Sequence, residues 1–197
     1  MNEPADPACR PEVIPGERIF LSHLLQSDVP LLARWMSDLE MNTYLGAPGK
    51  SYTLEQEQTW FDNLAKSDDK IFAIVVRDGQ RLIGSVSLMG ISHLHGSAEL
   101  GIGIGDKDAW GRGYGSEAIR LICDYGFTFL SLSSICLWHA AFNERGHRAY
   151  LKAGFKVAGR WRASRTFNGQ RYDRILMDIT RDELGPSRLR GLIGQIG

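Results

Sequence analysis

The chain has 197 residues, 43% of them hydrophobic, which suits one globular domain with a sizeable core rather than two domains. Its 23 Lys and Arg balance 23 Asp and Glu, so the net charge of zero gives no general affinity for nucleic acid or anionic membranes. No apolar run approaches the ~20 residues of a membrane span, and the first 16 residues lack the apolar segment of a signal peptide. Three cysteines without metal-ligand spacing predict a reducing compartment and no metal site. We therefore expect a soluble cytoplasmic protein.

The charges are unevenly distributed along the chain. Residues 1–69 carry twelve acids against five Lys and Arg, whereas residues 141–174 carry nine Lys and Arg against two acids. This polarity suits a cationic ligand on one side and a phosphorylated ligand on the other. An ordinary solvated surface gives the same count.

The first half of the chain predicts a strand, two helices and a hairpin. Residues 1–16 contain four prolines and are typical of a mobile arm that precedes a folded domain over residues 17–182. A strand is expected over 18–25, helices over 29–37 and 53–66, and a loop over 38–50 between them. Strands over 70–77 and 81–91 are joined by a tight turn at Asp78-Gly79.

The second half predicts strands and helices in alternation. Strands are expected over 98–104 and 134–141, helices over 117–130 and 143–153, and a final hairpin of 155–165 and 170–179 around Asn168-Gly169. Residues 183–197 are expected to form a C-terminal tail. A strand, a helix and another strand in the centre require one parallel pair within an otherwise antiparallel sheet.

A glycine-rich loop separates the strand 98–104 from the helix that follows. Gly111, Gly113 and Gly115 alternate with other residues, and glycine permits positive φ and close approach of a ligand to the backbone. The first turn of the next helix adds unpaired N–H groups and the positive end of its dipole. The loop therefore predicts a phosphate or pyrophosphate site, and the alternative is a tight strand-to-helix turn without a ligand.

Five segments together resemble the GNAT superfamily of N-acetyltransferases, and more closely its Rim-like branch of protein N-terminal and polyamine acetyltransferases. The segments begin at Glu99-Leu-Gly-Ile-Gly and Trp110-Gly-Arg-Gly-Tyr-Gly-Ser, continue with Asn143-Glu-Arg-Gly-His-Arg-Ala-Tyr150 and Ala153-Gly-Phe155, and end with Phe167-Asn-Gly-Gln-Arg-Tyr172. The resemblance covers residues 17–182. It implies an α/β (α+β) fold, the GNAT fold, whose mixed central sheet has two splayed parallel strands and is flanked by helices.

The resemblance also implies acetyl-coenzyme A as co-substrate, held between the splayed strands. Its pantetheine arm is expected to pair with the backbone of Ile102, Gly103 and Ile104, and a backbone N–H near Ile102 or Gly103 to hold the reaction's oxyanion. The pyrophosphate is expected at the loop, whose residues are Trp110, Gly111, Arg112, Gly113, Tyr114, Gly115 and Ser116.

Two residues of the helix 143–153 are expected to reach the thioester. Asn143 and Tyr150 are seven residues apart, about two helical turns, and so share one helix face. The resemblance gives Asn143 a hydrogen bond to the pantetheine and makes the Tyr150 hydroxyl the acid that protonates the leaving thiolate. The alternatives are an ordinary N-cap for Asn143 and a core aromatic for Tyr150.

Glu99 is the first candidate for the base that deprotonates the attacking amine, because it is the single carboxylate of an apolar strand beside the predicted thioester. A solvent-facing residue or a salt bridge is the alternative, and His93, His95 and His139 are the other candidate bases. We expect the acceptor between the first two helices and the last hairpin, with Trp35, Tyr44 and Glu99 as substrate-binding residues and Asp38 and Glu40 as partners for a cationic amine.

The leading hypothesis is transfer of an acetyl group to a primary amine by direct attack. The acceptor is a protein N-terminus, a polyamine, an amino sugar or another small amine, because fold alone does not fix function. The competing hypothesis is a catalytically silent coenzyme A sensor or interaction module of the same fold. A homodimer is a further expectation, with the last hairpin or the tail as its interface.

Overall fold

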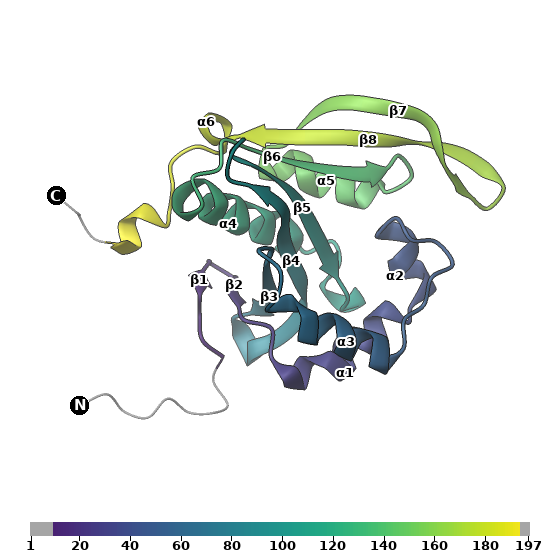
Figure 1. The fold of residues 1–197 in the computed structure, drawn as a ribbon, viewed down its shortest axis with the longest axis horizontal. Coiled ribbons are helices and arrows are strands. Elements are labelled where there is room, and N and C mark those ends of the chain that lie inside the picture. The colour runs from purple at the N-terminus through teal and green to yellow at the C-terminus, as the bar shows by residue number, and fades with distance from the viewer. Residues whose placement is uncertain (1–9, 194–197) are drawn as a thin grey trace.

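A computed structural model describes residues 10–193 of the chain (Figure 1). Its strands are β1 (Ile14–Pro15), β2 (Ile19–Ser22), β3 (Lys70–Val76), β4 (Arg81–Ser92), β5 (Ser97–Ile104), β6 (Ser134–Ala140), β7 (Lys156–Phe167) and β8 (Gln170–Thr180). Its α-helices are α1 (Val29–Met36), α2 (Leu39–Tyr44), α3 (Leu54–Leu64), α4 (Tyr114–Phe129), α5 (Glu144–Ala153) and α6 (Arg181–Leu184). None of the helices within residues 10–193 combines the length and apolar character that a membrane span requires.

All eight strands form one mixed sheet in the order β1-β2-β3-β4-β5-β6-β8-β7. β5 and β6 pair in parallel, joined by α4, and every other neighbouring pair of described strands is antiparallel. The parallel pairing runs only from Ser97 opposite Ser134 to Glu99 opposite Cys136, although both strands continue. β5 and β6 therefore splay apart after Glu99, and the prediction of a mixed sheet with two splayed parallel strands is confirmed.

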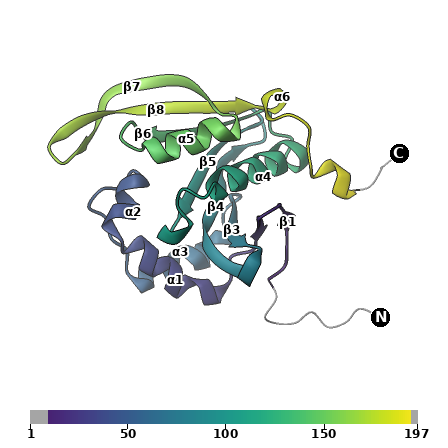
Figure 2. The same cartoon turned by 180° about the vertical axis from the view of Figure 1, so that it is seen from behind.

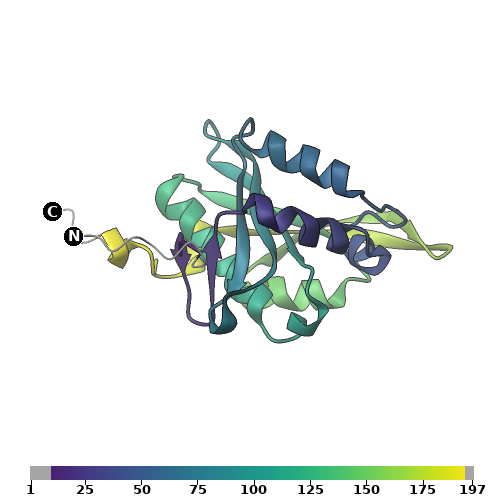
Figure 3. The same ribbon diagram turned by 90° about the horizontal axis from the view of Figure 1, so that it is seen from below.

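Helices cover the two faces of the sheet unequally. The main core lies between the sheet and α4, which contributes Ile119, Ile122 and Phe127, and Figure 2 shows α4 and α5 over this face. A smaller core around Phe20, Trp35 and Val75 lies on the opposite face under α1. Figure 3 shows α3 and α5 on opposite sides of the sheet, with the β7–β8 hairpin reaching beyond the rest of the molecule at one end. On the face opposite α5, Cys136 and Trp138 of β6 and Leu176 and Asp178 of β8 are only partly buried, so this face is partly exposed there.

The expectation of a loop over residues 38–50 is wrong in part, because α2 occupies Leu39–Tyr44. The Asp38 carboxylate caps this helix by accepting the N–H groups of Glu40 (2.8 Å) and Met41 (3.1 Å). The next helix in that half, α3, has the predicted capping box between Thr53 and Gln56.

α4 also begins earlier than the periodicity predicts, at Tyr114 instead of Glu117. Gly113 is its N-cap in the left-handed region (φ +84°), so the last residues of the predicted loop are the first turn of the helix.

Both ends of the folded domain reach further than the sequence predicts. Residues 1–9 of the predicted arm lie outside the described residues, but Ile14 and Pro15 pair with β2 and Ile14 is buried. At the other end, Leu184 and Leu189 are buried in the main core, and the Leu189 N–H donates to the Asp124 carboxylate. This part of the predicted tail packs on its own chain.

Candidate active site

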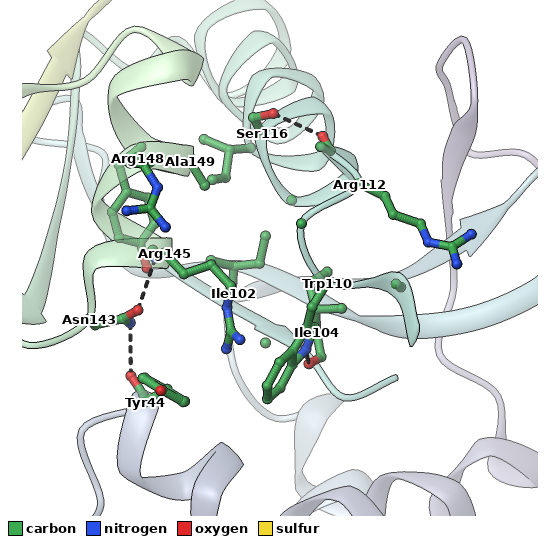
Figure 4. Close-up of a pocket in the computed structure, with 18 of the residues that line it drawn as sticks. Tyr44, Ile102, Ile104, Trp110, Arg112, Ser116, Asn143, Arg145, Arg148 and Ala149 are labelled. Carbon is green, nitrogen blue, oxygen red and sulfur yellow. Dashed lines mark hydrogen bonds between the residues drawn. The ribbon is translucent and has the colours of Figure 1, made fainter. Parts of the chain in front are cut away.

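The gap between the splayed strands opens into a cavity of about 460 Å³. β5, the loop after it, the start of α4, one face of α5 and the end of α2 line the cavity (Figure 4). The lining residues from α2 and β5 are Met41, Tyr44, Leu45, Ile102, Gly103 and Ile104, and those from α5 and its N-cap include Asn143, Arg145, Arg148, Ala149, Tyr150 and Lys152.

The edge of β5 that faces this gap offers free backbone groups. The Gly105 N–H donates to Ile83 O of β4 at 2.9 Å, and alternation along the strand therefore directs the N–H groups of Ile102 and Ile104 to the other side, into the gap. The Ile104 carbonyl on this side already accepts the indole N–H of Trp110 at 2.7 Å. The Ile102 N–H and carbonyl and the Ile104 N–H remain available to an extended ligand, which would bind as an added strand.

The loop and the first turn of α4 have the features of an anion site. Gly111 (φ +73°) and Gly113 (φ +84°) take left-handed conformations that favour glycine. No side chain caps the N-terminus of α4, so the first N–H groups of this 16-residue helix point to the cavity side together with the positive end of its dipole. Arg18 fixes the loop from outside by donating to the Arg112 carbonyl at 2.8 Å. This combination fits a phosphate or pyrophosphate.

α5 presents Asn143 and Tyr150 to the same cavity. The Asn143 Oδ1 accepts the Gly146 N–H at 2.9 Å, and its Nδ2 donates to the Tyr44 carbonyl at 3.3 Å, so the side chain joins the start of α5 to the end of α2 (Figure 4). Gly146 permits this contact, because a Cβ there would overlap the Asn143 amide. Tyr150 is 9% exposed, and burial raises the pKa of its phenol to about 12.

Arg145 closes the α2 side of the cavity. Its guanidinium lies 3.4 Å from the centre of the Trp110 ring and 4.7 Å from that of Tyr44, and the two rings meet edge to face. Burial lowers the pKa of Arg145, and no carboxylate within residues 10–193 forms a salt bridge with it. The stack leaves a positive charge at the wall of a site that suits an anionic ligand.

Glu99 lies at the fork but on the other face of the sheet. Ala98 and Leu100 point into the main core with Tyr150, so alternation places Glu99 on the opposite face. There it is half-buried, next to Cys136 in the register of β6. Burial lowers the pKa of Arg174, and the charge of Glu99 opposes that shift. Burial and then the charges of Glu99 and Asp178 raise the pKa of the Cys136 thiol, which makes Cys136 a poor nucleophile.

A family comparison identifies this arrangement. A family model described as "Acetyltransferase (GNAT) domain" matches residues 18–156, most of the chain. The chain belongs to the GNAT acetyltransferase family. It is therefore an acetyl-CoA-dependent N-acetyltransferase, and acetyl-CoA is its co-substrate.

Other GNAT proteins resemble it along much of its length. The chain is 28% identical over 173 residues to the uncharacterized N-acetyltransferase YoaA of Bacillus subtilis, which covers 86% of this chain and 97% of YoaA. It is 37% identical over 106 residues to the spermidine N(1)-acetyltransferase of Escherichia coli, covering 54% of this chain and 56% of that protein. The crystal structure of spermidine N-acetyltransferase from Vibrio cholerae in complex with CoA and spermine has a TM-score of 0.76 at 24% identity, covering 85% of this chain and 98% of that one. This last likeness shows the fold.

The residues of this GNAT protein fit the donor that the family uses. The free backbone of Ile102 and Ile104 matches an extended pantetheine amide chain, and the loop at Gly111–Gly113 with the start of α4 matches a pyrophosphate. Lys152 and Arg148 also line the cavity and add positive charge to its wall, whereas the Arg112 guanidinium points away from the cavity (Figure 4).

Most of the predicted cofactor-binding residues lie together around the cavity. These are Ile102, Gly103, Ile104, Trp110, Gly111, Arg112, Gly113, Gly115, Ser116 and Asn143, with the predicted acid Tyr150. Tyr114 is not among the lining residues; Arg18 lies over its ring, 5.0 Å from the ring centre. Met41 and Leu45 also line the cavity. The sequence does not predict their role, because it does not predict the helix α2.

The predicted acceptor residues are less well grouped. Tyr44 lines the cavity, but Trp35 is 9% exposed in the smaller core, against the backbone of Gly105. Asp38 and Glu40 are not free for an amine, because Lys107 forms a 2.6 Å ion pair with each of them. Both carboxylates therefore fix the loop to α2.

Proposed function

We propose that this N-acetyltransferase moves the acetyl group directly from acetyl-CoA to a primary amine, with Glu99 as base, Tyr150 as acid and Asn143 as an anchor for the donor. Acetyl-CoA brings an acetyl group activated as a thioester. The protein's part is to hold both substrates at the fork between β5 and β6, to take a proton from the amine and to give one to the sulfur.

The observation that supports this proposal is the position of the two titratable groups on opposite faces of the sheet at one fork. Tyr150 belongs to the buried α5 side, whereas Glu99 is at the last paired position of β5 and faces the partly exposed side. An amine that enters from the partly exposed side meets the carboxylate first. The thiol then leaves on the side of the phenol, so neither group has to serve both substrates.

An amine bound next to Glu99 can give its proton to the carboxylate as it attacks the thioester. Among residues 10–193, no salt bridge occupies Glu99, so its carboxylate is available to the amine. The backbone N–H of Ile102 or Gly103 is our candidate for holding the oxyanion that forms as the amine adds.

For the acceptor we propose an amine of the polyamine class. The relatives support this choice, because the E. coli relative is named for spermidine and the V. cholerae structure contains spermine. A protein N-terminus carries the same reacting group and is the second arm of the test.

The test is a thiol-release assay with acetyl-CoA and a panel of polyamines and peptides that differ in their N-terminal residue. We expect release with at least one amine, and a Tyr150→Phe enzyme that binds acetyl-CoA normally but turns over at least ~10²-fold more slowly. Unchanged turnover in Tyr150→Phe would remove Tyr150 from its role. Donor binding without turnover on every amine would favour the silent sensor.

A further inference from the structure

Two histidines form a hydrogen-bonded pair beside Tyr150. His147 of α5 and His139 of β6 meet with Nδ1 of the former 3.0 Å from Nε2 of the latter. His139 is buried, and its ring lies 5.6 Å from the Tyr150 ring, centre to centre. His147 is partly exposed and precedes Tyr150 by three residues, one helical turn. The pair thus connects solvent to the surroundings of the proposed acid.

The hydrogen bonds define which nitrogens carry protons. The Nδ1 of His139 lies 2.9 Å from the Ala140 carbonyl, and a carbonyl only accepts, so this Nδ1 is the donor. In the neutral ring the Nε2 of His139 is then an acceptor and takes its hydrogen bond from the Nδ1–H of His147. The one nitrogen of the pair left for an added proton is the Nε2 of His147.

A proton added at the Nε2 of His147 leaves both hydrogen bonds intact, and it puts the charge on the partly exposed ring rather than on buried His139, where a charge would be more costly to desolvate. Burial, and next the charge of His147, lower the pKa of His139, in agreement with a ring that stays neutral. The pair therefore accepts a single proton, and that proton gives His147 a positive charge.

The other charged groups near the pair are engaged elsewhere. On α5, Glu144 and Arg148 form an exposed pair at 3.5 Å. From α4, Arg120 donates to the Ala153 carbonyl at the far end of α5. From β8, uncharged Ile175 lies opposite His139, while Asp173 binds Arg160.

On the sheet's other face, Arg174 of β8 lies over the Trp138 ring, and Cys136 and Trp138 alternate with His139 along β6. Among the described residues, the charge acting on His139 is that of His147.

We propose that His147 is a positioning residue for the acetyl transfer: held by His139, its imidazolium stabilises the phenolate that Tyr150 becomes when it protonates the leaving thiolate. This inference rests on the proposed role of Tyr150. A phenol with a pKa of about 12 is a weak donor to a sulfur whose conjugate acid has a pKa near ~8.5, so a positive charge within one helical turn assists the transfer.

The first test reads the protons directly. Long-range ¹H–¹⁵N NMR spectra of the full chain with labelled histidine, assigned through His139→Asn and His147→Asn, should show both rings as Nδ1–H tautomers above pH 8. On acidification His147 should gain a proton while His139 stays neutral. An Nε2–H tautomer for His139, or protonation of His139 before His147, would overturn the inference.

The second test uses His147→Asn, whose amide keeps a donor near the place of Nδ1 but never becomes charged. We expect the ratio of the wild-type kcat to the kcat of the variant to be about ten at pH 5.5 and less than about two at pH 8.5. Protonation of the acceptor amine cancels in this ratio. His23→Asn, an exposed histidine outside the site, should leave the ratio near one at every pH.

The outcomes separate the two proposals. An equal loss of kcat in His147→Asn at both pH values would mean a structural role and would overturn the inference, while Tyr150→Phe still tests the acid. If Tyr150→Phe turns over normally, the proposed function fails first, whatever the histidines do. Normal kcat for His147→Asn at pH 5.5 would also contradict the inference.

Discussion

The two faces of the sheet at the β5–β6 fork are built in different ways. On the α5 face, backbone groups and buried side chains make up much of the site, such as the free edge of β5, Asn143 and the phenol of Tyr150, and cationic side chains line the rest of the cavity. On the opposite face, Glu99 and Arg174 are half-exposed charged side chains.

This difference indicates which half of the reaction the fold fixes. Backbone geometry changes only when the fold changes, so recognition of acetyl-CoA belongs to the architecture. Side-chain charges on a partly exposed face change by single substitutions, which suits a family whose members differ in their acceptors. Single substitutions can therefore weaken one side of the site at a time.

The largest effect is expected from Glu99→Gln, which keeps the shape of the side chain but removes the base. The kcat/KM for the amine should fall by at least about 10²-fold, with no change in acetyl-CoA affinity by calorimetry. Asp178→Asn is the matched control, because Asp178 lies in the same cross-strand row, beyond Cys136. An equal loss in both variants would assign the effect to the charge of the face and not to a base.

On the donor face, Gly111→Ala should weaken acetyl-CoA binding about tenfold. Gly111 (φ +73°) and Gly169 (φ +71°) are both left-handed with open space around an added Cβ, but only Gly111 lines the cavity. Both alanine variants should lose about 1 kcal/mol of unfolding free energy. Gly169→Ala should bind the donor normally, and a binding loss there would refute the backbone account of this face.

A smaller effect is expected from Lys107→Met, which releases Asp38 and Glu40. Lys107 holds the pKa of Asp38 below its usual value; without the lysine this pKa rises towards the usual value, at which Asp38 is still charged near pH 7. A cationic acceptor should then bind with a KM about twofold to threefold lower, and added salt should remove the difference. The exposed Lys50→Met is the control. A higher KM in Lys107→Met would mean that the ion pairs shape the acceptor site.

The donor face was readable from the sequence because its signals are local. Its residues can be interpreted without knowledge of distant contacts. They are glycines at alternate positions, an asparagine that caps a helix and a tyrosine seven residues later on the same helix. The parallel pair followed from the order of the elements alone.

The surroundings of α2 could not be predicted in the same way. The short helix α2 was hidden because Gly46, Pro48 and Gly49 dominate its surroundings, although Asp38 is a good N-cap. The position of Trp35 in its helix fits either a residue that lines a pocket or a residue of the core. Only its packing against Gly105 in the structure shows that it belongs to the core. Lys107 is 67 residues from Glu40 in the chain, so no local pattern reveals that it occupies the predicted amine site.

The central claim is direct transfer across the fork, with both substrates bound at once. Initial rates measured with acetyl-CoA and the amine varied together test it most directly. The account predicts intersecting lines in double-reciprocal plots, and no acetylated protein by intact mass after incubation with acetyl-CoA alone. Parallel lines together with an acetyl group on the chain, at Cys136 or elsewhere, would contradict it.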